Sequence, residues 1–192
     1  MPSERSFSTV DLTDDRYTVE QSLIRNKYAA EDSTGRVVLR GKQKLFKLKE
    51  EFPFVDGDGN DAFTVRAGGV VDIAGNYVIT DASTDEPVVV LDNDLSFFQD
   101  TWRLRDPETE AKLAEINSRG AAVTLARNLI SVVGPLIPHK YEITDADGNH
   151  VGRIEGQLSV RDRYRITIDD ASTVPREAVV AAAMVIDAIQ GN

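Results

Sequence analysis

The sequence predicts an all-β protein with one helix, in which a closed antiparallel β-barrel encloses a buried hydrophobic C-terminal helix. From Tyr17 onward, short apolar segments alternate with clusters of Asp, Gly and Asn, a pattern typical of β-hairpins. A Tyr-x-x-x-Asp unit occurs three times, which indicates a sheet built from similar hairpins. Residues 178–189 are apolar apart from Asp187. A helix that is apolar on every side must be enclosed, and closure of the sheet around it removes exposed edges.

Composition is that of a soluble globular protein whose charge is unusual. The 192 residues are 41% hydrophobic, which suits one domain with a proper core. The chain has no Cys, which excludes disulfides, thiolate nucleophiles and Cys-ligated metals. Its 32 acidic residues outnumber 22 basic ones, for a net charge of −10. Two interpretations stay open, a surface adapted to a salt-loving (haloarchaeal-type) source and an ordinary acidic protein. Both disfavour nucleic-acid binding, which needs a positive face.

The N-terminal residues are interpreted as a flexible leader. Residues 1–15 are polar and acidic and lack the apolar stretch of a signal peptide. We therefore expect a leader over 1–15, a single barrel domain over 16–192 and a cytoplasmic location.

Hairpins follow one another along the domain. Strand segments flank the turns at Asp32–Gly35 and Asp56–Asp61. The second turn begins like a calcium loop, but Ala67 occupies the twelfth position where an EF-hand needs Glu, so a hairpin turn is favoured. Residues 111–116 follow another turn and are predicted to form a returning strand. The three repeat units, each followed by a second strand, are predicted to be equivalent hairpins; they are Tyr28–Asp32, Tyr77–Asp81 and Tyr141–Asp145.

The C-terminal helix is predicted over about residues 175–190. Pro175 suits the first turn of a helix, and Gly191 is a typical stop. Its apolar stretch is too short for a bilayer, which needs about 20 residues. Asp187 is the exception, and two interpretations stay open: a buried carboxylate with a basic partner, or a side chain that reaches water at the barrel mouth.

These features together resemble the LURP-one-related family, which belongs with tubby C-terminal domains and phospholipid scramblases. The resemblance rests on the three repeat units, on Ser22–Tyr28 before the first of them and on the apolar helix. It covers roughly residues 16–192 and implies a tubby-like closed barrel of about twelve strands around the helix. Tubby domains bind phosphoinositide headgroups through basic residues, and scramblases act at membranes with calcium. The resemblance supplies no catalytic residues.

A basic segment is the main candidate binding site. Four of the chain's seven Lys residues fall within residues 40–49, in an otherwise acidic protein. Concentrated positive charge can hold phosphate or an anionic headgroup, and the alternative is a solvated face whose Lys residues pair with nearby carboxylates. The candidate ligands for the anion are Arg40, Lys42, Lys44, Lys47 and Lys49.

The sequence offers no catalytic motif. His139 and His150 are too few for a structural zinc site without carboxylate help, and ordinary exposed histidines are the alternative. No cofactor or metal is expected. We therefore expect a non-enzymatic binding or scaffold protein whose partner is an anionic membrane surface or a phosphate ligand. The alternative is an enzyme or small-ligand-binding protein with a pocket at a barrel mouth.

Overall fold

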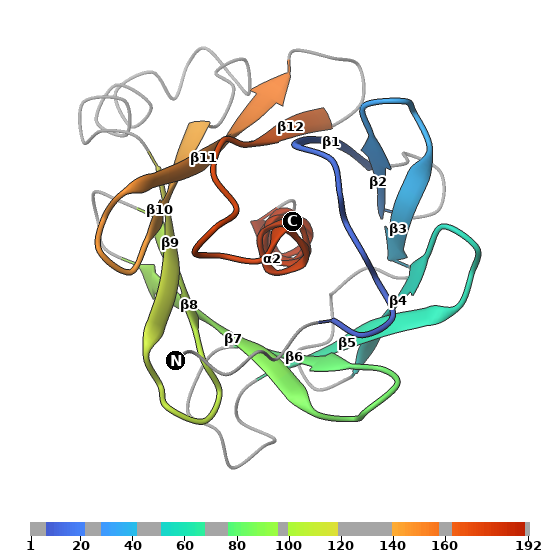
Figure 1. The fold of residues 1–192 in the computed structure, drawn as a ribbon, viewed down its shortest axis with the longest axis horizontal. Coiled ribbons are helices and arrows are strands. Elements are labelled where there is room, and N and C mark those ends of the chain that lie inside the picture. Colours follow the sequence, from blue (N-terminus) through green and yellow to red (C-terminus); the bar gives the residue numbers. More distant parts are fainter. Residues whose placement is uncertain are drawn as a thin grey trace.

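Twelve antiparallel strands close into a barrel around one helix (Figure 1). The computed structural model describes residues 7–21, 28–41, 51–67, 77–95, 100–118, 140–157 and 163–190. Each strand pairs with its neighbours in chain order, and the first strand closes the ring on the last. The strands are β1 (Arg16–Gln21), β2 (Tyr28–Asp32), β3 (Val37–Gly41), β4 (Phe52–Asp56), β5 (Asp61–Ala67), β6 (Tyr77–Asp81), β7 (Pro87–Leu95), β8 (Asp100–Arg105), β9 (Lys112–Ser118), β10 (Lys140–Asp145), β11 (His150–Gln157) and β12 (Arg163–Ile168). The predicted fold class is confirmed, as is the strand expected over residues 111–116.

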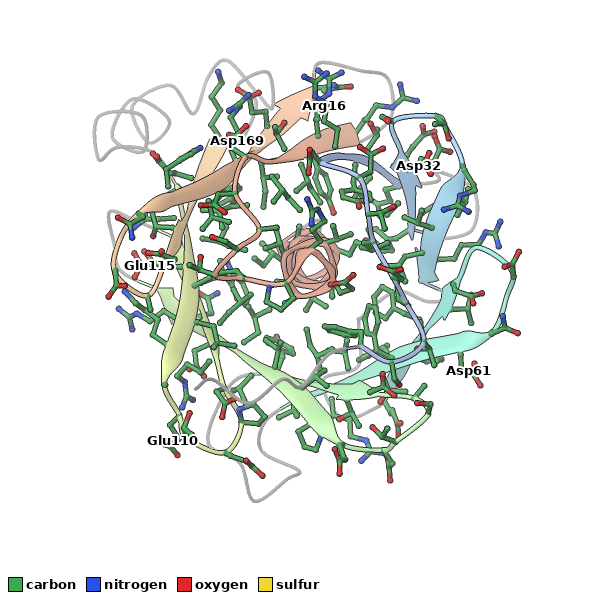
Figure 2. All side chains as sticks on the ribbon, in the orientation of Figure 1. Arg16, Asp32, Asp61, Glu110, Glu115 and Asp169 are labelled. Carbon is green, nitrogen blue, oxygen red and sulfur yellow. The ribbon has the colours of Figure 1, made fainter. Side chains whose placement is uncertain are left out.

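The helix α2 (Arg176–Gln190) occupies the axis of the barrel. Every residue from Ala178 to Ile186 is at most 3% exposed, so all faces of this part of the helix are covered. Figure 2 shows side chains filling the space between the helix and the strands, while the labelled charged residues lie on the outside. A buried hydrogen bond from the Tyr164 hydroxyl to the carbonyl of Ala183, at 3.1 Å, links β12 to the helix. The helix is therefore the core of the barrel.

Five tight turns lie at one end of the barrel, and each begins with an aspartate. One carboxylate oxygen of each accepts a hydrogen bond from the backbone N–H two residues later, at 2.8–3.0 Å. Such Asx turns fix the local backbone and so set the hairpin register. The five residues are Asp32, Asp56, Asp81, Asp106 and Asp145. Three of the turns place Gly at positive φ, and the other two place Asp85 and Glu110 there, at φ 56° and 58°. We call this end, where α2 also begins, the turn end.

The repeat unit occurs more often than predicted. The three predicted hairpins are confirmed, since Tyr28, Tyr77 and Tyr141 all stand at or near the start of a strand that runs into an Asp turn. Two further strands follow the same rule with other aromatics, Phe52 before Asp56 and Trp102 before Asp106. The unit is thus aromatic-x-x-x-Asp. The aromatic lies at the end of the barrel opposite the turns, and the carboxylate caps the turn.

The expectation of a flexible leader is wrong for residues 7–15. Phe7, Val10 and Leu12 are 4–7% exposed and belong to the core. The Phe7 ring packs edge-on against Phe63, with 5.6 Å between centroids. In Figure 1 the segment crosses the barrel mouth beside the start of α2. We call residues 7–15 the strap. Its apolar side chains cover core surface that the strands leave open, and this burial overrides its polar composition.

Candidate functional site

The predicted basic segment lies only partly within the described residues. Lys42, Lys44, Lys47 and Lys49 lie outside them. Arg40 is exposed on β3, and its Nη1 donates a hydrogen bond to the carbonyl oxygen of Gly57 at 2.7 Å. The structure therefore joins Arg40 to the turn after β4. The strand ends on either side of the segment, at Gly41 of β3 and Phe52 of β4, lie at the end of the barrel away from the turn end.

Arg40 also lines a groove at the barrel mouth. The groove lies between the strap, the start of β3 and the turn after β4, with a volume of about 310 Å³. Val10 and Val38 contribute its apolar part. Gly57 is essential to its shape, because a Cβ there would stand 2.1 Å from the carbonyl oxygen of Val37. The charged residues that line it are Asp11, Arg36, Arg40, Asp56 and Asp58.

Most of the groove's charged groups already serve the local structure. Hydrogen bonds, led by that from the Asn60 side chain, hold the pKa of Asp56 below its usual value, so this carboxylate stabilises the turn in its charged form. Arg36 pairs with Asp32 at 3.3 Å, although its side chain is 74% exposed. The lowered pKa therefore has a structural cause. The groove offers charges of both signs to a small polar ligand rather than a poised acid or base.

His150 takes part in a charged cluster on the outer face of β10 and β11. Its Nε2 lies 2.9 Å from Asp169 and its Nδ1 lies 3.1 Å from Glu142. These two contacts, the one to Asp169 first, raise the pKa of His150. Arg153 also binds Asp169, at 2.9 Å. The cluster is a surface ion-pair network, which matches the expectation of an exposed histidine. His139 lies outside the described residues.

The described residues show neither a calcium loop nor another metal site. The predicted turn at Asp56 is a hairpin turn between β4 and β5, as expected. Within the described ranges, no group of three or more His, Asp or Glu side chains is arranged to hold a metal ion. No helix in the described part of the chain has the length and apolarity needed to cross a membrane. The side chain of Asp187 lies outside the described residues, so both interpretations of it stay open.

Comparison with known families agrees with this architecture. The model of the LURP-one-related family matches residues 37–187, from β3 into the central helix. The chain belongs to the LURP-one-related family. The predicted resemblance is thereby confirmed, while the salt-loving source stays a prediction. A search of curated proteins found no match.

A solved structure shows that the LURP-one-related chain shares its fold with a plant protein. The X-ray structure of a protein from Arabidopsis thaliana is similar, with a TM-score of 0.56 and 12% sequence identity. The similarity covers 96% of this chain and 99% of that one. At this identity the likeness shows the fold alone.

The sequence suggested a pocket at a barrel mouth only as an alternative and identified none of its residues, because the strap was not recognised. The signal was present in the spacing of Phe7, Val10 and Leu12, three apolar residues in a polar segment. Short segments of this kind are hard to tell from a frayed terminus, since their burial depends on surface supplied by distant strands. The groove needs the strap, β3 and the turn at Gly57 together, and no local pattern brings these three together.

Proposed function

We propose that this LURP-one-related protein is a non-enzymatic binding protein that holds anionic lipid headgroups or phosphate through Arg40, Lys42, Lys44, Lys47 and Lys49. The observation that carries the proposal is the concentration of four of the chain's seven Lys residues between the ends of β3 and β4. A local positive segment in a protein of net charge −10 is the feature that an anionic surface would recognise.

The barrel supports a role in binding at its surface. The helix fills the lumen with buried apolar side chains, so the interior resembles a packed core more than a ligand cavity. Two paired strands, β3 and β4, anchor both ends of the basic segment, which reduces the entropy lost on binding. The location that follows is peripheral to an anionic membrane, with attraction that weakens as salt shortens the Debye length.

Vesicle sedimentation tests the proposal. The probe is a set of vesicles of phosphatidylcholine with and without phosphatidylglycerol, at low salt. We expect binding only to the anionic vesicles, and its loss when Lys42, Lys44, Lys47 and Lys49 are changed to Gln. A control variant removes four positive charges elsewhere, from Arg66, Arg103, Lys112 and Lys140, and should keep most of the binding. Equal loss in both variants would show that only net charge matters and would contradict the proposal.

A second candidate function is binding of a small polar ligand in the groove under the strap. The observation that favours it is a recess of about 310 Å³ at the barrel mouth, with Arg40 on one side and Asp58 on another. This volume falls at the lower end of the range for small-molecule sites. A ligand that carries both a cationic and an anionic group would match charges of both signs.

Filling the groove separates the two candidates. Val10→Trp would place a large side chain at its apolar wall. If the groove binds ligand, small metabolites that raise the melting temperature of the native protein should lose this effect in the variant. Vesicle binding should not change, because the basic segment keeps all four Lys residues. Retained ligand effects in Val10→Trp would exclude the groove.

A further inference from the structure

Two arginines stand diagonally on the outer face where the barrel closes. In the register of β1 with β12, Arg16 lies opposite Thr167, and Thr18 lies opposite Arg165. All four side chains point outward, because Tyr17, Val19 and the alternate residues of β12 are buried. Diagonal partners on paired strands lie about 7–8 Å apart, within reach of long side chains. The four residues form a square with guanidinium groups on one diagonal and hydroxyls on the other.

These two guanidinium groups differ from the other arginines of the described ranges. Seven of those arginines contact a carboxylate within 4.0 Å, and Arg40 donates to a backbone carbonyl. Arg16 and Arg165 have no such contact with any described residue, and both are exposed. Figure 2 shows Arg16 on the outside of the barrel wall. In a chain with 32 acidic residues, two adjacent guanidinium groups that have no carboxylate partner among the described residues are unexpected.

Two nearby carboxylates contact other cations, whereas Glu31, opposite Thr18 on β2, lies within 4.0 Å of neither arginine. Glu155 lies opposite Arg165 across the strands, but it binds Lys140 at 3.4 Å and Arg153 at 3.6 Å. Glu20 binds Arg163.

On the other side of the square, Asp15 binds Arg176 at 2.6 Å and Asp14 accepts hydrogen bonds from Ser33. Hydrogen bonds from Ser33, the side-chain one first, lower the pKa of Asp14 to about 2. Among the described residues, no carboxylate therefore lies within 4.0 Å of either guanidinium group, and both can contact a ligand.

The geometry points to a binding site for a phosphoryl group, which we propose is held by the guanidinium groups of Arg16 and Arg165 with the hydroxyls of Thr18 and Thr167. A planar guanidinium presents paired N–H donors that match two phosphate oxygens. Two guanidinium groups on one diagonal can donate hydrogen bonds to a tetrahedral anion from both sides. Thr167 is only 8% exposed although it points outward, which we attribute to the stems of Arg16 and Arg153 beside it.

A phosphoryl group suits the square better than a carboxylate does. Phosphate offers more acceptor oxygens than a carboxylate, so it can serve both guanidinium groups and a hydroxyl at once. The site is independent of the proposed basic segment, because Arg16 begins β1 near the turn end and the segment lies beyond Gly41. Free phosphate compounds and lipid phosphomonoesters share this chemistry, and the test separates them.

Titration followed by the Arg Nε–Hε signals in NMR tests the site. The probes are inorganic phosphate, acetate, and vesicles that contain phosphatidic acid, all at low ionic strength. We expect phosphate to give a saturable shift of the Arg16 and Arg165 signals, at least about tenfold tighter than acetate at the same ionic strength. Binding to the vesicles alone, lost with Arg16→Gln and Arg165→Gln, would support the same site and assign its source to lipid.

The control variant removes the same charge from ion-paired positions. Arg66→Gln with Arg103→Gln should keep the phosphate affinity within about twofold, whereas Arg16→Gln with Arg165→Gln should weaken it at least about tenfold. Thr18→Val should weaken it less and leave acetate unaffected. The inference is overturned if neither probe binds, if acetate binds as tightly as phosphate, or if the two double variants lose affinity equally. The basic segment is intact in every variant, so a loss of binding with Arg16→Gln and Arg165→Gln cannot come from that segment.

Discussion

The backbone N–H of Leu12 donates a hydrogen bond of 2.7 Å to a carboxylate oxygen of Glu177, although 165 residues separate the two. Glu177 lies in the first turn of α2, where the helix dipole favours negative charge. The adjacent Arg176 donates to the carbonyl oxygen of Asp14 at 3.0 Å and to the Asp15 carboxylate at 2.6 Å. Strap and helix are thus joined at the turn end, and the strap covers one mouth of the barrel.

Breaking this junction should destabilise the fold. We expect Glu177→Ala to lower the free energy of unfolding by about 1–3 kcal/mol, because the Leu12 N–H loses its acceptor in a partly buried place. Glu177→Gln keeps an oxygen acceptor and should cost less. Urea denaturation measures both. Equal stability of the three proteins would show that the junction contributes nothing.

The strap should behave as part of the core. Phe7→Ala removes a ring that is 6% exposed, and core substitutions of this kind cost about 3–5 kcal/mol. A flexible leader would instead give a change within about 0.5 kcal/mol. Asp11→Ala, at an exposed position of the same segment, is the matched control and should have little effect. Thermal melts of the two variants decide between these descriptions.

Gly57 should tolerate no side chain. A Cβ at this position would stand 2.1 Å from the backbone oxygen of Val37, and backbone atoms of paired strands cannot move aside cheaply. We expect Gly57→Ala to lower the free energy of unfolding by about 1–3 kcal/mol, as overpacking does. Asp58→Ala in the same turn keeps the backbone N–H that binds Asp56 and should be nearly neutral. A neutral Gly57→Ala would mean that the close approach of the two segments is absent.

The charged cluster around His150 should make the stability of the protein depend on pH. Contacts with Asp169 and then Glu142 raise the pKa of His150 above 6.5, and contact with His150 lowers the pKa of Asp169 below 3.8. The histidine contribution is fully present below pH 6.5 and is lost as pH rises through the raised value. The aspartate contribution is present above pH 3.8 and is lost as pH falls through the lowered value. The cluster therefore stabilises the protein most between these limits.

NMR titration checks this directly. The chain has two His residues, so a His139→Gln background leaves one imidazole to follow. Its midpoint should lie above 6.5 and should fall when Asp169 is replaced by Asn. A midpoint at or below 6.5 in the unmodified cluster would contradict the prediction. Because these side chains are about 40% exposed, the effect on stability should be small and should weaken with salt.

Barrel and helix were predictable because their signals are local. The apolar stretch at residues 178–189 indicates a buried helix, and the aspartates of the turns indicate hairpins, from the residue types alone. Two of the five copies of the repeat were missed because Phe52 and Trp102 take the place of Tyr, so the common property is a buried or partly buried aromatic rather than one residue type.

Surface sites were less predictable, since they depend on register. Arg16 and Arg165 become neighbours only when the first strand pairs with the last, 149 positions apart in the chain. Within the described residues neither has an ion pair, and for Arg165 the reason is that the facing Glu155 contacts Lys140 and Arg153 instead. The sequence shows which residues are charged, but it does not show which carboxylate each basic side chain contacts in the fold.

Amide hydrogen exchange of α2 tests the central claim that this helix is the buried axis of the barrel. We expect the amides of Ala182–Ile186 to exchange as slowly as the most protected strand amides, at the rate set by global unfolding, because no smaller opening frees a helix enclosed by twelve strands. Fast exchange of these amides in a protein whose strands stay protected would show that the helix leaves the barrel, and would contradict the account.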